Sequence, residues 1–384
     1  MQVFKEVCEE RRWQWKMLLD GSTTARLERL MHADALTIIY GTSHALEHGF
    51  IRNLTTSRHM LVASVGKAFM ATGPKNRQLK GFRSFVESYG CKLNDLKLMP
   101  KTFLFSERKE CLDFFIHISK NTQSTWIVKP YGGYGGENIE MYYQLSPLID
   151  KFGKCDNQRA QYLAQEYLSN PLLLNGRKFD VRAYILIART NPYFVFYHAG
   201  YLRVAINKFS SDAGLNAHLT NTHIQSHVSG YVSGNHFWTY SELQQYIHNV
   251  STNQDDKFVQ EKLEPMVKQV GLFLLHSSMR TYERLPGTYL LLGLDFMITS
   301  DYHIWFIEAN NYPLWPSNAP KLDKQTYAMA NELLDLEMEI HSSPSMFVNL
   351  QPGAKYGSWE LVYNELSAHC SGQQYNPCKD FPVQ

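Results

Sequence analysis

The stretch that decides the fold is residues 288–310, TYLLLGLDFMITSDYHIWFIEAN. Its two apolar runs, joined by the polar residues 299–301, predict a β-hairpin. Each predicted strand carries a carboxylate among apolar neighbours, Asp295 in the first and Glu308 in the second. Because side chains alternate along a strand, Glu308 and Asn310 share a face. An isolated buried carboxylate is unfavourable without a cation. Asp295, Glu308 and Asn310 therefore predict an all-oxygen site suited to Mg²⁺. The alternative is that the two carboxylates reach solvent or an arginine.

A lysine and a glycine-rich loop follow one another earlier in the chain. TWIVK (125–129) predicts a strand that ends at Lys129, and PYGGYGGENI (130–139) follows it as a loop. Glycines such as Gly135 and Gly136 let backbone N–H groups approach an anion, and a lysine at the strand end can hold phosphate oxygens. The loop matches neither the Walker pattern GxxxxGK[ST] nor GxGxxG. Taken alone, it predicts either a phosphate-binding loop or a plain flexible turn.

A third stretch places three charges on one face of a predicted strand. In KFDVRAYILIA, alternation puts Lys178, Asp180 and Arg182 on the same side. Such a row is usually a solvated stripe on the surface. Here it begins a strand apolar enough to be central in a sheet, so we expect a polar ligand on that face. The hairpin predicted over residues 192–205 adds a further cation, Arg203.

The composition sets limits on the class of protein. The chain has 384 residues, 44% of them hydrophobic and 19% charged, which is typical of a globular protein. A net charge of +2 gives no indication of a nucleic-acid or membrane partner. No run approaches the ~18 apolar residues of a membrane helix, and the N-terminus lacks the apolar core of a signal peptide. Six scattered cysteines without a CxxC pair predict free thiols in a reducing compartment, so we expect a cytoplasmic protein.

Taken in order, these features resemble the ATP-grasp fold and, more narrowly, the tubulin–tyrosine ligase-like family. The resemblance is carried by TWIVKP (125–130), QEYLSNPLLLNGRKFDVRAYILIA (165–188), GYLRVA (200–205), HLTN (218–221), LLGLDFMI (291–298) and WFIEANNYP (305–313). It implies an α/β (α+β) fold in which the nucleotide lies between the central and the C-terminal domain. The implied parts are a small N-terminal α/β domain (1–70), a central domain (71–165), a C-terminal domain with the metal and substrate site (166–340) and an extension (341–384).

The resemblance also implies the roles of individual residues. ATP would be bound by Lys75, Lys129, Gly135, Gly136, Lys178 and Asp180, with Gln165, Glu166, Tyr167 and Leu168 along the adenine. Arg182 and Arg203 are the candidate catalytic residues, and Arg203, Thr220 and Asn221 would hold the incoming amino acid. Mg²⁺ would be bound by Asp295, Glu308 and Asn310. One departure is Glu137, an acid where the family's glycine loop usually carries a basic residue, so an inactive member stays an open alternative.

The function implied is an ATP-dependent ligase that adds amino acids to glutamate side chains of tubulin or a similar acidic protein through an acyl phosphate. The quoted motifs favour the polyglycylase branch, and hence glycine, over the polyglutamylases. A non-catalytic adaptor that binds microtubules or ATP is the second hypothesis, and a ligase acting on free small molecules is the third. The absence of HRD and DFG argues against a protein kinase. We expect a monomer located on microtubules or in cilia.

Overall fold

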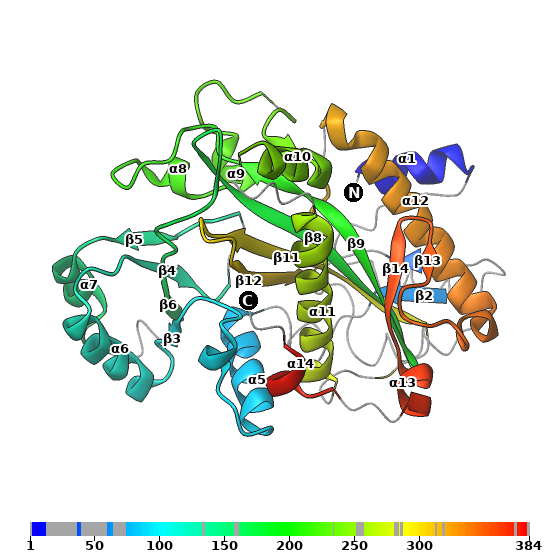
Figure 1. Cartoon of the computed structure of the whole chain (residues 1–384), viewed down its shortest axis with the longest axis horizontal. Helices are drawn as coiled ribbons and strands as arrows, with labels where there is room; N and C mark the ends of the chain where they lie inside the picture. The colour runs from blue at the N-terminus through cyan, green and yellow to red at the C-terminus, as the bar shows by residue number, and fades with distance from the viewer. Residues whose placement is uncertain are drawn as a thin grey trace, which may run out of the picture.

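The computed structural model describes residues 2–12, 37–39, 60–63, 74–132, 135–156, 161–232, 234–250, 257–279, 284, 287–311, 313–316, 319–371 and 375–381. Two sheets with helices packed on them form a mixed α+β fold (Figure 1), which confirms the predicted fold class. Within these residues, no helix is both long enough and apolar enough to cross a membrane.

The larger sheet has ten strands and forms the centre of the molecule. Its strands are β1 (Thr37–Ile39), β2 (Met60–Ala63), β7 (Leu173–Leu174), β8 (Arg177–Thr190), β9 (Tyr193–Val204), β10 (Phe237–Trp238), β11 (Thr288–Ile298), β12 (Ile304–Asn311), β13 (Lys355–Tyr356) and β14 (Trp359–Asn364). They run in the order β1-β2-β11-β8-β9-β14-β13, while β12 pairs with β11, β10 with β9 and β7 with β8. The long strands β8, β9 and β11 therefore lie side by side at its middle.

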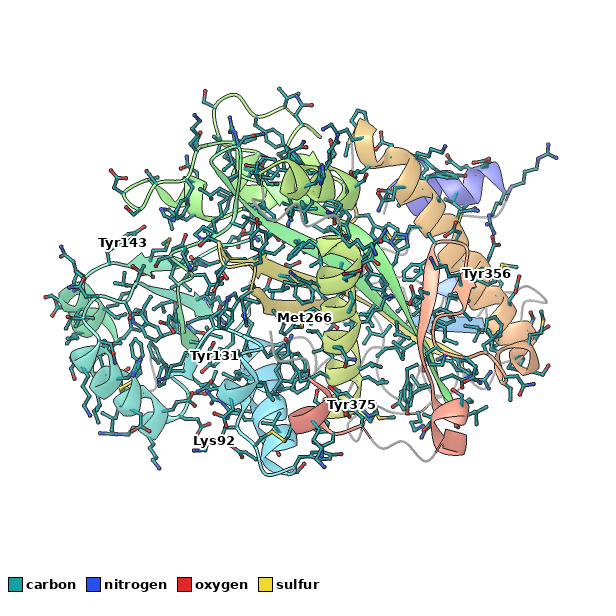
Figure 2. The ribbon with its side chains drawn as sticks, viewed as in Figure 1. Lys92, Tyr131, Tyr143, Met266, Tyr356 and Tyr375 are labelled. Carbon is teal, nitrogen blue, oxygen red and sulfur yellow. A yellow bond between two sulfur atoms is a disulfide. The ribbon has the colours of Figure 1, made fainter. Side chains whose placement is uncertain are left out.

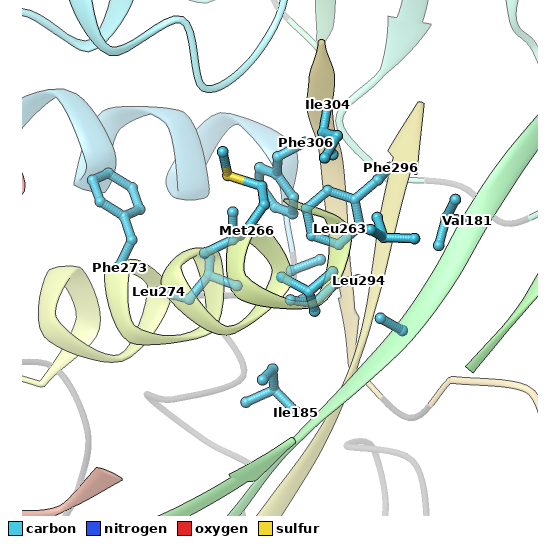
Figure 3. Packing of buried hydrophobic residues seen from close by; sticks show 14 of the residues in the cluster. Val181, Ile185, Leu263, Met266, Phe273, Leu274, Leu294, Phe296, Ile304 and Phe306 are labelled. Carbon is cyan, nitrogen blue, oxygen red and sulfur yellow. The ribbon is translucent and has the colours of Figure 1, made fainter. Parts of the chain in front are cut away.

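Both faces of the long strands are apolar, which explains why helices cover both sides. On β8, Val181 and Ile185 belong to one buried cluster, and Tyr184 and Leu186 belong to the other. Helix α11 (Glu264–Ser278) packs on the first face (Figure 3), and α12 (Pro320–Ser342) packs on the second. Fully burying one such side chain stabilises the fold by roughly 1.5–3 kcal/mol. A Cβ on Gly271 of α11 would lie 2.5 Å from Cδ1 of Ile185, so glycine permits this close approach.

The smaller sheet has four strands in the order β3-β6-β4-β5. They are β3 (Thr102–Leu104), β4 (Trp126–Pro130), β5 (Glu140–Tyr142) and β6 (Tyr162–Glu166). Helices α6 (Arg108–Lys120) and α7 (Leu145–Phe152) pack on it around a separate cluster that includes Phe114 and Trp126. The other helices within the described residues are α1 (Gln2–Glu10), α5 (Lys75–Glu87), η2 (Leu93–Leu96), α8 (Leu215–His218), α9 (Thr222–Gln225), α10 (Tyr240–Val250), η4 (Val259–Leu263), η5 (Pro344–Phe347), α13 (Glu365–Ser371) and α14 (Pro377–Asp380).

The decisive hairpin forms as predicted. Strands β11 and β12 pair antiparallel with Asp295 opposite Glu308, and a tight turn over residues 299–303 joins them. The register shifts just after Asp295, which marks a bulge at this position. A bulge bends a strand and redirects its side chains, and bulges are frequent beside functional sites.

Both ends of the chain join the larger sheet. Strand β2 pairs in parallel with the start of β11, and β14 pairs with β9. Residues after Ser342 are thus packed against the main sheet, although their sequence is only weakly patterned. Most of the N-terminal domain predicted over residues 1–70 lies outside the described residues. The domain boundaries stay predictions.

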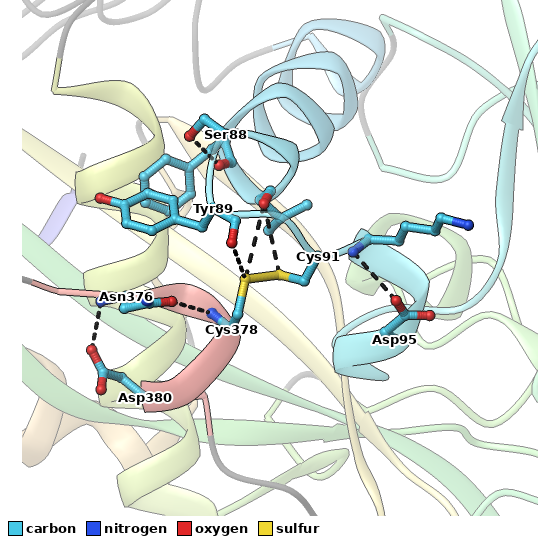
Figure 4. Close-up of a disulfide and its surroundings, with 10 residues drawn as sticks. Ser88, Tyr89, Cys91, Asp95, Asn376, Cys378 and Asp380 are labelled. Atoms are coloured by element: carbon cyan, nitrogen blue, oxygen red, sulfur yellow. Dashed lines mark hydrogen bonds between the residues drawn. A yellow bond between two sulfur atoms is a disulfide. The ribbon is translucent and has the colours of Figure 1, made fainter.

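The prediction of free thiols is wrong for four of the six cysteines. Cys91 is bonded to Cys378 (Figure 4), and Cys111 to Cys155. These partners are 287 and 44 residues apart in the chain, so no local spacing pattern could reveal them. The first bond fixes α14 beside the end of α5, and the second links α6 to the segment after α7. Disulfides are typical of oxidising compartments, so the cysteines no longer support the expected reducing one.

Candidate active site

Charged side chains from four neighbouring strands meet in a row across the larger sheet. Asp180 on β8 is the register partner of Arg203 on β9, and Arg182 on β8 is the partner of Asp295 on β11. Asp295 in turn lies opposite Glu308 on β12. Because the strands follow one another as β9-β8-β11-β12, these residues form one continuous polar line within an otherwise apolar sheet.

Two arginines neutralise two aspartates in this row. Nε of Arg182 donates to Oδ1 of Asp295 at 2.5 Å and its Nη2 to Oδ2 at 3.1 Å. Nη2 of Arg203 lies 3.1 Å from the same Oδ2, and its Nε donates to both oxygens of Asp180 at 3.0 Å. All four side chains are at most 9% exposed. Burial disfavours the charged guanidinium, but Asp180 and Asp295 keep the pKa of Arg203 well above its ordinary value.

The predicted metal ligands do come together. Nδ2 of Asn310 donates to Oδ2 of Asp295 at 3.1 Å and to Oε1 of Glu308 at 3.3 Å. Carboxylate and amide oxygens are the donors that Mg²⁺ prefers, so the chemistry of this set fits the ion. Among the described residues, however, no group of three or more His, Cys, Asp and Glu side chains could hold a metal. An ion bound here would therefore rely on the amide oxygen of Asn310, on water or on phosphate for further ligands.

Glu308 lies close to two lysines from other elements. Nζ of Lys75, the first residue of α5, lies 3.3 Å from Oε2 of Glu308. Nζ of Lys129 donates to Oε1 of Gln165 at 2.9 Å, and the amide of Gln165 donates to Oγ1 of Thr102 at 2.9 Å. Burial lowers the pKa of Lys129 to about 8, although Glu308 opposes this shift. Burial also disfavours the charge on Glu308, but Lys75 and Lys129 outweigh it and hold the pKa of the carboxyl at about 2.

A pocket lies between α5, the smaller sheet and β12. It is lined by Lys75, Gln78, Leu79, Phe82, Met99, Thr102, Lys129, Leu163, Gln165, Ile307 and Glu308. Gln78 and Thr102 were not predicted as site residues. Nε2 of Gln78 donates to the carbonyl of Ala309 at 2.9 Å, which ties α5 to β12. A glutamine on the same helix face as Leu79, Phe82 and Val86 was the available signal for this contact. Thr102 offers no such signal in the sequence, because its link to the site is a contact with the distant Gln165.

Lys178 is buried next to an aromatic side chain. Its Nζ donates to Oη of Tyr167 at 2.9 Å and lies 4.3 Å from the centre of that ring. Burial lowers the pKa of Lys178 to about 7, although Asp180 opposes this shift. Asp180 already binds Arg203, so it compensates the lysine only in part. Lys178 and Lys129 are thus two ammonium groups that the fold holds at a cost, as expected where an anion is to be bound.

The glycine-rich loop rests against α9 and the residue before it. A Cβ on Gly136 would lie 2.6 Å from Cδ1 of Ile224 and 3.0 Å from Oδ1 of Asn221. Oε1 of Glu137 lies 3.9 Å from Nε2 of His223, and both side chains are more than half exposed. Glu137 therefore faces α9, the helix that follows HLTN. It is the acid that stands where the family's glycine loop usually carries a basic residue.

The structure thus unites most of the predicted residues and assigns some of them other contacts. Gln165 binds Lys129 with its side chain, and the phenol of Tyr167 binds Lys178. That the two residues also lie along an adenine stays a prediction. The carbonyl of Asn221, the residue before α9, accepts from the N–H of Gln225 at the end of that helix, and Thr220 beside Asn221 is 8% exposed. Their roles, and those of the backbone from Glu166 to Leu168, stay predictions.

Several known proteins are similar to this chain. It is 32% identical to protein polyglycylase TTLL10 of Mus musculus over 296 residues, which cover 70% of the chain and 40% of that relative. It is 26% identical to inactive polyglycylase TTLL10 of Homo sapiens over 309 residues, covering 73% of the chain and 45% of the relative. Tubulin glycylase 3A of Drosophila melanogaster is 25% identical over 251 residues, covering 64% and 24%. The chain spans less than half the length of these curated relatives.

The model of the tubulin-tyrosine ligase family matches residues 49–346, well over half of the chain. That range includes the four charged strands, α5 and the glycine-rich loop. The ATP-grasp-like fold of the family agrees with the mixed sheets found here, and the named relatives lie in its polyglycylase branch. The chain belongs to the tubulin-tyrosine ligase family.

Proposed function

We propose that this protein is an ATP-dependent ligase that joins amino acids, with glycine favoured, to glutamate side chains of tubulin or a similar acidic protein. The observation that carries the proposal is a pair of buried lysines: the charge of Lys129 interacts with Glu308 and Asp295, and that of Lys178 interacts with Asp180. Burial depresses the pKa of both lysines, and a polyphosphate would supply the negative charge that they lack. The named polyglycylases and tubulin glycylases support the choice of reaction.

The chemistry needs little covalent participation from the protein. A carboxylate must be activated before an amine can displace one of its oxygens, and transfer of a phosphoryl group to it gives an acyl phosphate. Lys129, Lys178 and Arg182 would offset the negative charge on the phosphates while that transfer occurs. Bound Mg²⁺ would supply further positive charge at the phosphate oxygens, and Asp295, Glu308 and Asn310 are the residues that would hold it.

Arg203 is the best candidate for the carboxylate of the incoming amino acid. Its planar guanidinium can bind two oxygens at once. At present it is bound by Asp180 and Asp295, and both aspartates keep it charged within the sheet. We propose that Thr220 and Asn221 complete this subsite from the segment before α9.

A second candidate function is a non-catalytic adaptor that binds ATP or microtubules without turnover. The acidic Glu137 in the glycine-rich loop favours it, and one relative is named an inactive polyglycylase. The joint presence of Asp295, Glu308 and Asn310 favours the ligase, because two carboxylates and an amide are the groups that suit Mg²⁺.

The test is mass spectrometry of tubulin, or of a glutamate-rich peptide, after incubation with the protein, ATP, Mg²⁺ and one amino acid at a time. A ligase adds whole residues of one amino acid, and glycine is expected. The matched control is the Glu308→Gln variant, which should add none. Calorimetric titration with ATP in the presence and absence of Mg²⁺ identifies the adaptor, which would bind the nucleotide and leave every acceptor unmodified.

A further inference from the structure

A chain of hydrogen bonds leads from the ammonium of Lys178 to a backbone carbonyl. Nζ of Lys178 donates to Oη of Tyr167 at 2.9 Å, and that Oη lies 2.7 Å from Nδ1 of His218. The other ring nitrogen of His218, Nε2, lies 3.1 Å from the carbonyl of Ala213. A carbonyl can only accept, so Nε2 carries the proton and Nδ1 accepts from Tyr167. Every bond in the chain therefore points the same way, from the lysine outward.

The hydrogen-bond chain joins three separate segments; its two ends, Lys178 and His218, are buried, and Tyr167 between them is partly buried. Lys178 is 3% exposed and His218 is 2% exposed. Lys178 is the second residue of the central strand β8, Tyr167 follows β6, and His218 ends α8. Because the oxygen of Tyr167 gives its proton to His218, it presents a lone pair to Lys178. This arrangement favours an ammonium over a neutral amine at Nζ.

The charged and titratable groups around the chain are few. Asp180 attracts the ammonium along β8, but Arg203 already binds that carboxylate. Burial lowers the pKa of His218 and the ammonium of Lys178 lowers it further, so this imidazole stays neutral down to a lower pH than an ordinary histidine does. Tyr143, labelled in Figure 2, follows β5 and is half exposed. Its Oη lies 3.4 Å from Nε2 of His218, the ring nitrogen that does not contact Tyr167.

We propose that Tyr167 and His218 are positioning residues that hold Lys178 for the nucleotide phosphates and set the pH range in which it takes up the proton needed to bind them. The inference rests on the proposed function, because Lys178 must meet phosphate. It adds that ATP binding is coupled to proton uptake at one lysine and that a tyrosine and a histidine outside the phosphate contacts control this coupling. His218 thereby gains a role that does not require it to touch the nucleotide.

The experiment is calorimetric titration of the full chain with ATP and Mg²⁺ between about pH 5.5 and 9, in two buffers of different ionisation enthalpy. The difference between the buffers gives the number of protons taken up. For the wild type we expect uptake near neutral pH and an affinity that falls as pH rises. Tyr167→Phe keeps the ring but loses the oxygen that accepts from Lys178. The pH range of proton uptake, and the pH at which ATP affinity falls, should therefore both move down by about one unit.

Two further variants separate positioning from simple structural damage. His218→Asn keeps an oxygen near the place of Nδ1 and should restore most of the wild-type profile, whereas His218→Leu should shift it as Tyr167→Phe does. Tyr143→Phe is the matched control, because it removes a phenol from the other side of His218, and its profile should equal that of the wild type.

The results have distinct meanings. If the wild type binds ATP and both Tyr167→Phe and His218→Leu keep its pH profile, the inference is wrong and the proposed function stands. If the wild type binds no ATP at any pH, both the proposed function and the inference are wrong. Should Tyr167→Phe fail to fold, the comparison of His218→Asn with His218→Leu decides, since equal profiles would overturn the proposal.

Discussion

Replacing Lys178 by methionine removes a charge that the fold buries at a cost. Methionine has a similar length and is apolar, so it can fill the same space. The change leaves no polar group without a partner, because Tyr167 still donates to His218 and Asp180 still binds Arg203. The variant should therefore be more stable than the wild type, and it should lose ATP binding.

The size of this gain follows from the pKa. Burial takes the pKa of Lys178 from 10.5 to about 7, and each pKa unit is worth 1.36 kcal/mol. The charged form thus costs about 4 kcal/mol at pH 7, and we expect about 2–4 kcal/mol of added stability from Lys178→Met. Between pH 7 and about 10 the unfolded chain binds one more proton at this residue than the folded chain does. As the pH rises, the free energy of unfolding of the wild type should therefore increase relative to that of the variant by about 1.4 kcal/mol for each pH unit.

The assay is urea denaturation of both proteins at pH 6, 7, 8 and 9. The other titrating groups, Lys129 among them, contribute equally to both proteins and cancel in the difference. The variant's advantage should be greatest at pH 6 and should shrink steadily toward pH 9. An advantage that does not change with pH, or a variant less stable than the wild type at pH 7, would refute the reasoning that Lys178 is a strained, desolvated ammonium.

Three further outcomes are expected. Glu308→Gln removes the negative charge beside the buried Lys129, so its melting temperature at pH 7 should fall and its ATP turnover should drop at least ~10²-fold; an unchanged turnover would exclude the carboxylate from the site. Glu137→Lys should alter ATP affinity at low salt less than about twofold by calorimetry, because Glu137 faces His223; a several-fold gain would place the loop over the phosphates instead. Cys378→Ser should lower the free energy of unfolding by about 2–4 kcal/mol relative to the wild type when no reductant is present, and the two proteins should be equally stable when it is. Equal stability without reductant would mean that this disulfide does not form.

The parts of the site that the sequence could predict are those set by local alternation. One polar turn between two apolar runs is sufficient to predict the hairpin, and alternation then puts Glu308 and Asn310 on one face. The same rule places Lys178, Asp180 and Arg182 together on β8. These predictions hold because a strand's two-residue repeat is fixed by backbone geometry and does not depend on the rest of the chain.

What the sequence could not predict is which distant partner each side chain meets. The sequence predicts Asp295 as a metal ligand. In the structure Arg182 and Arg203 already neutralise its charge, because the order of the strands brings β8, β9 and β11 together. The pairing of Cys91 with Cys378 likewise depends on how the C-terminal segment returns to α5 (Figure 4). Strand order and chain return are global properties, and no local pattern encodes them.

The most direct test of the proposed reaction follows the oxygen atoms of the acceptor. The full chain is given ATP, Mg²⁺, glycine and a glutamate-rich peptide whose side-chain carboxylates carry ¹⁸O, and the released phosphate is analysed by mass spectrometry. If the carboxylate is activated as an acyl phosphate, the amine displaces phosphate together with one acceptor oxygen, so each phosphate should carry one ¹⁸O. Ligated peptide with unlabelled phosphate would contradict this route, and a complete mixture that releases no phosphate would contradict the assignment as a ligase.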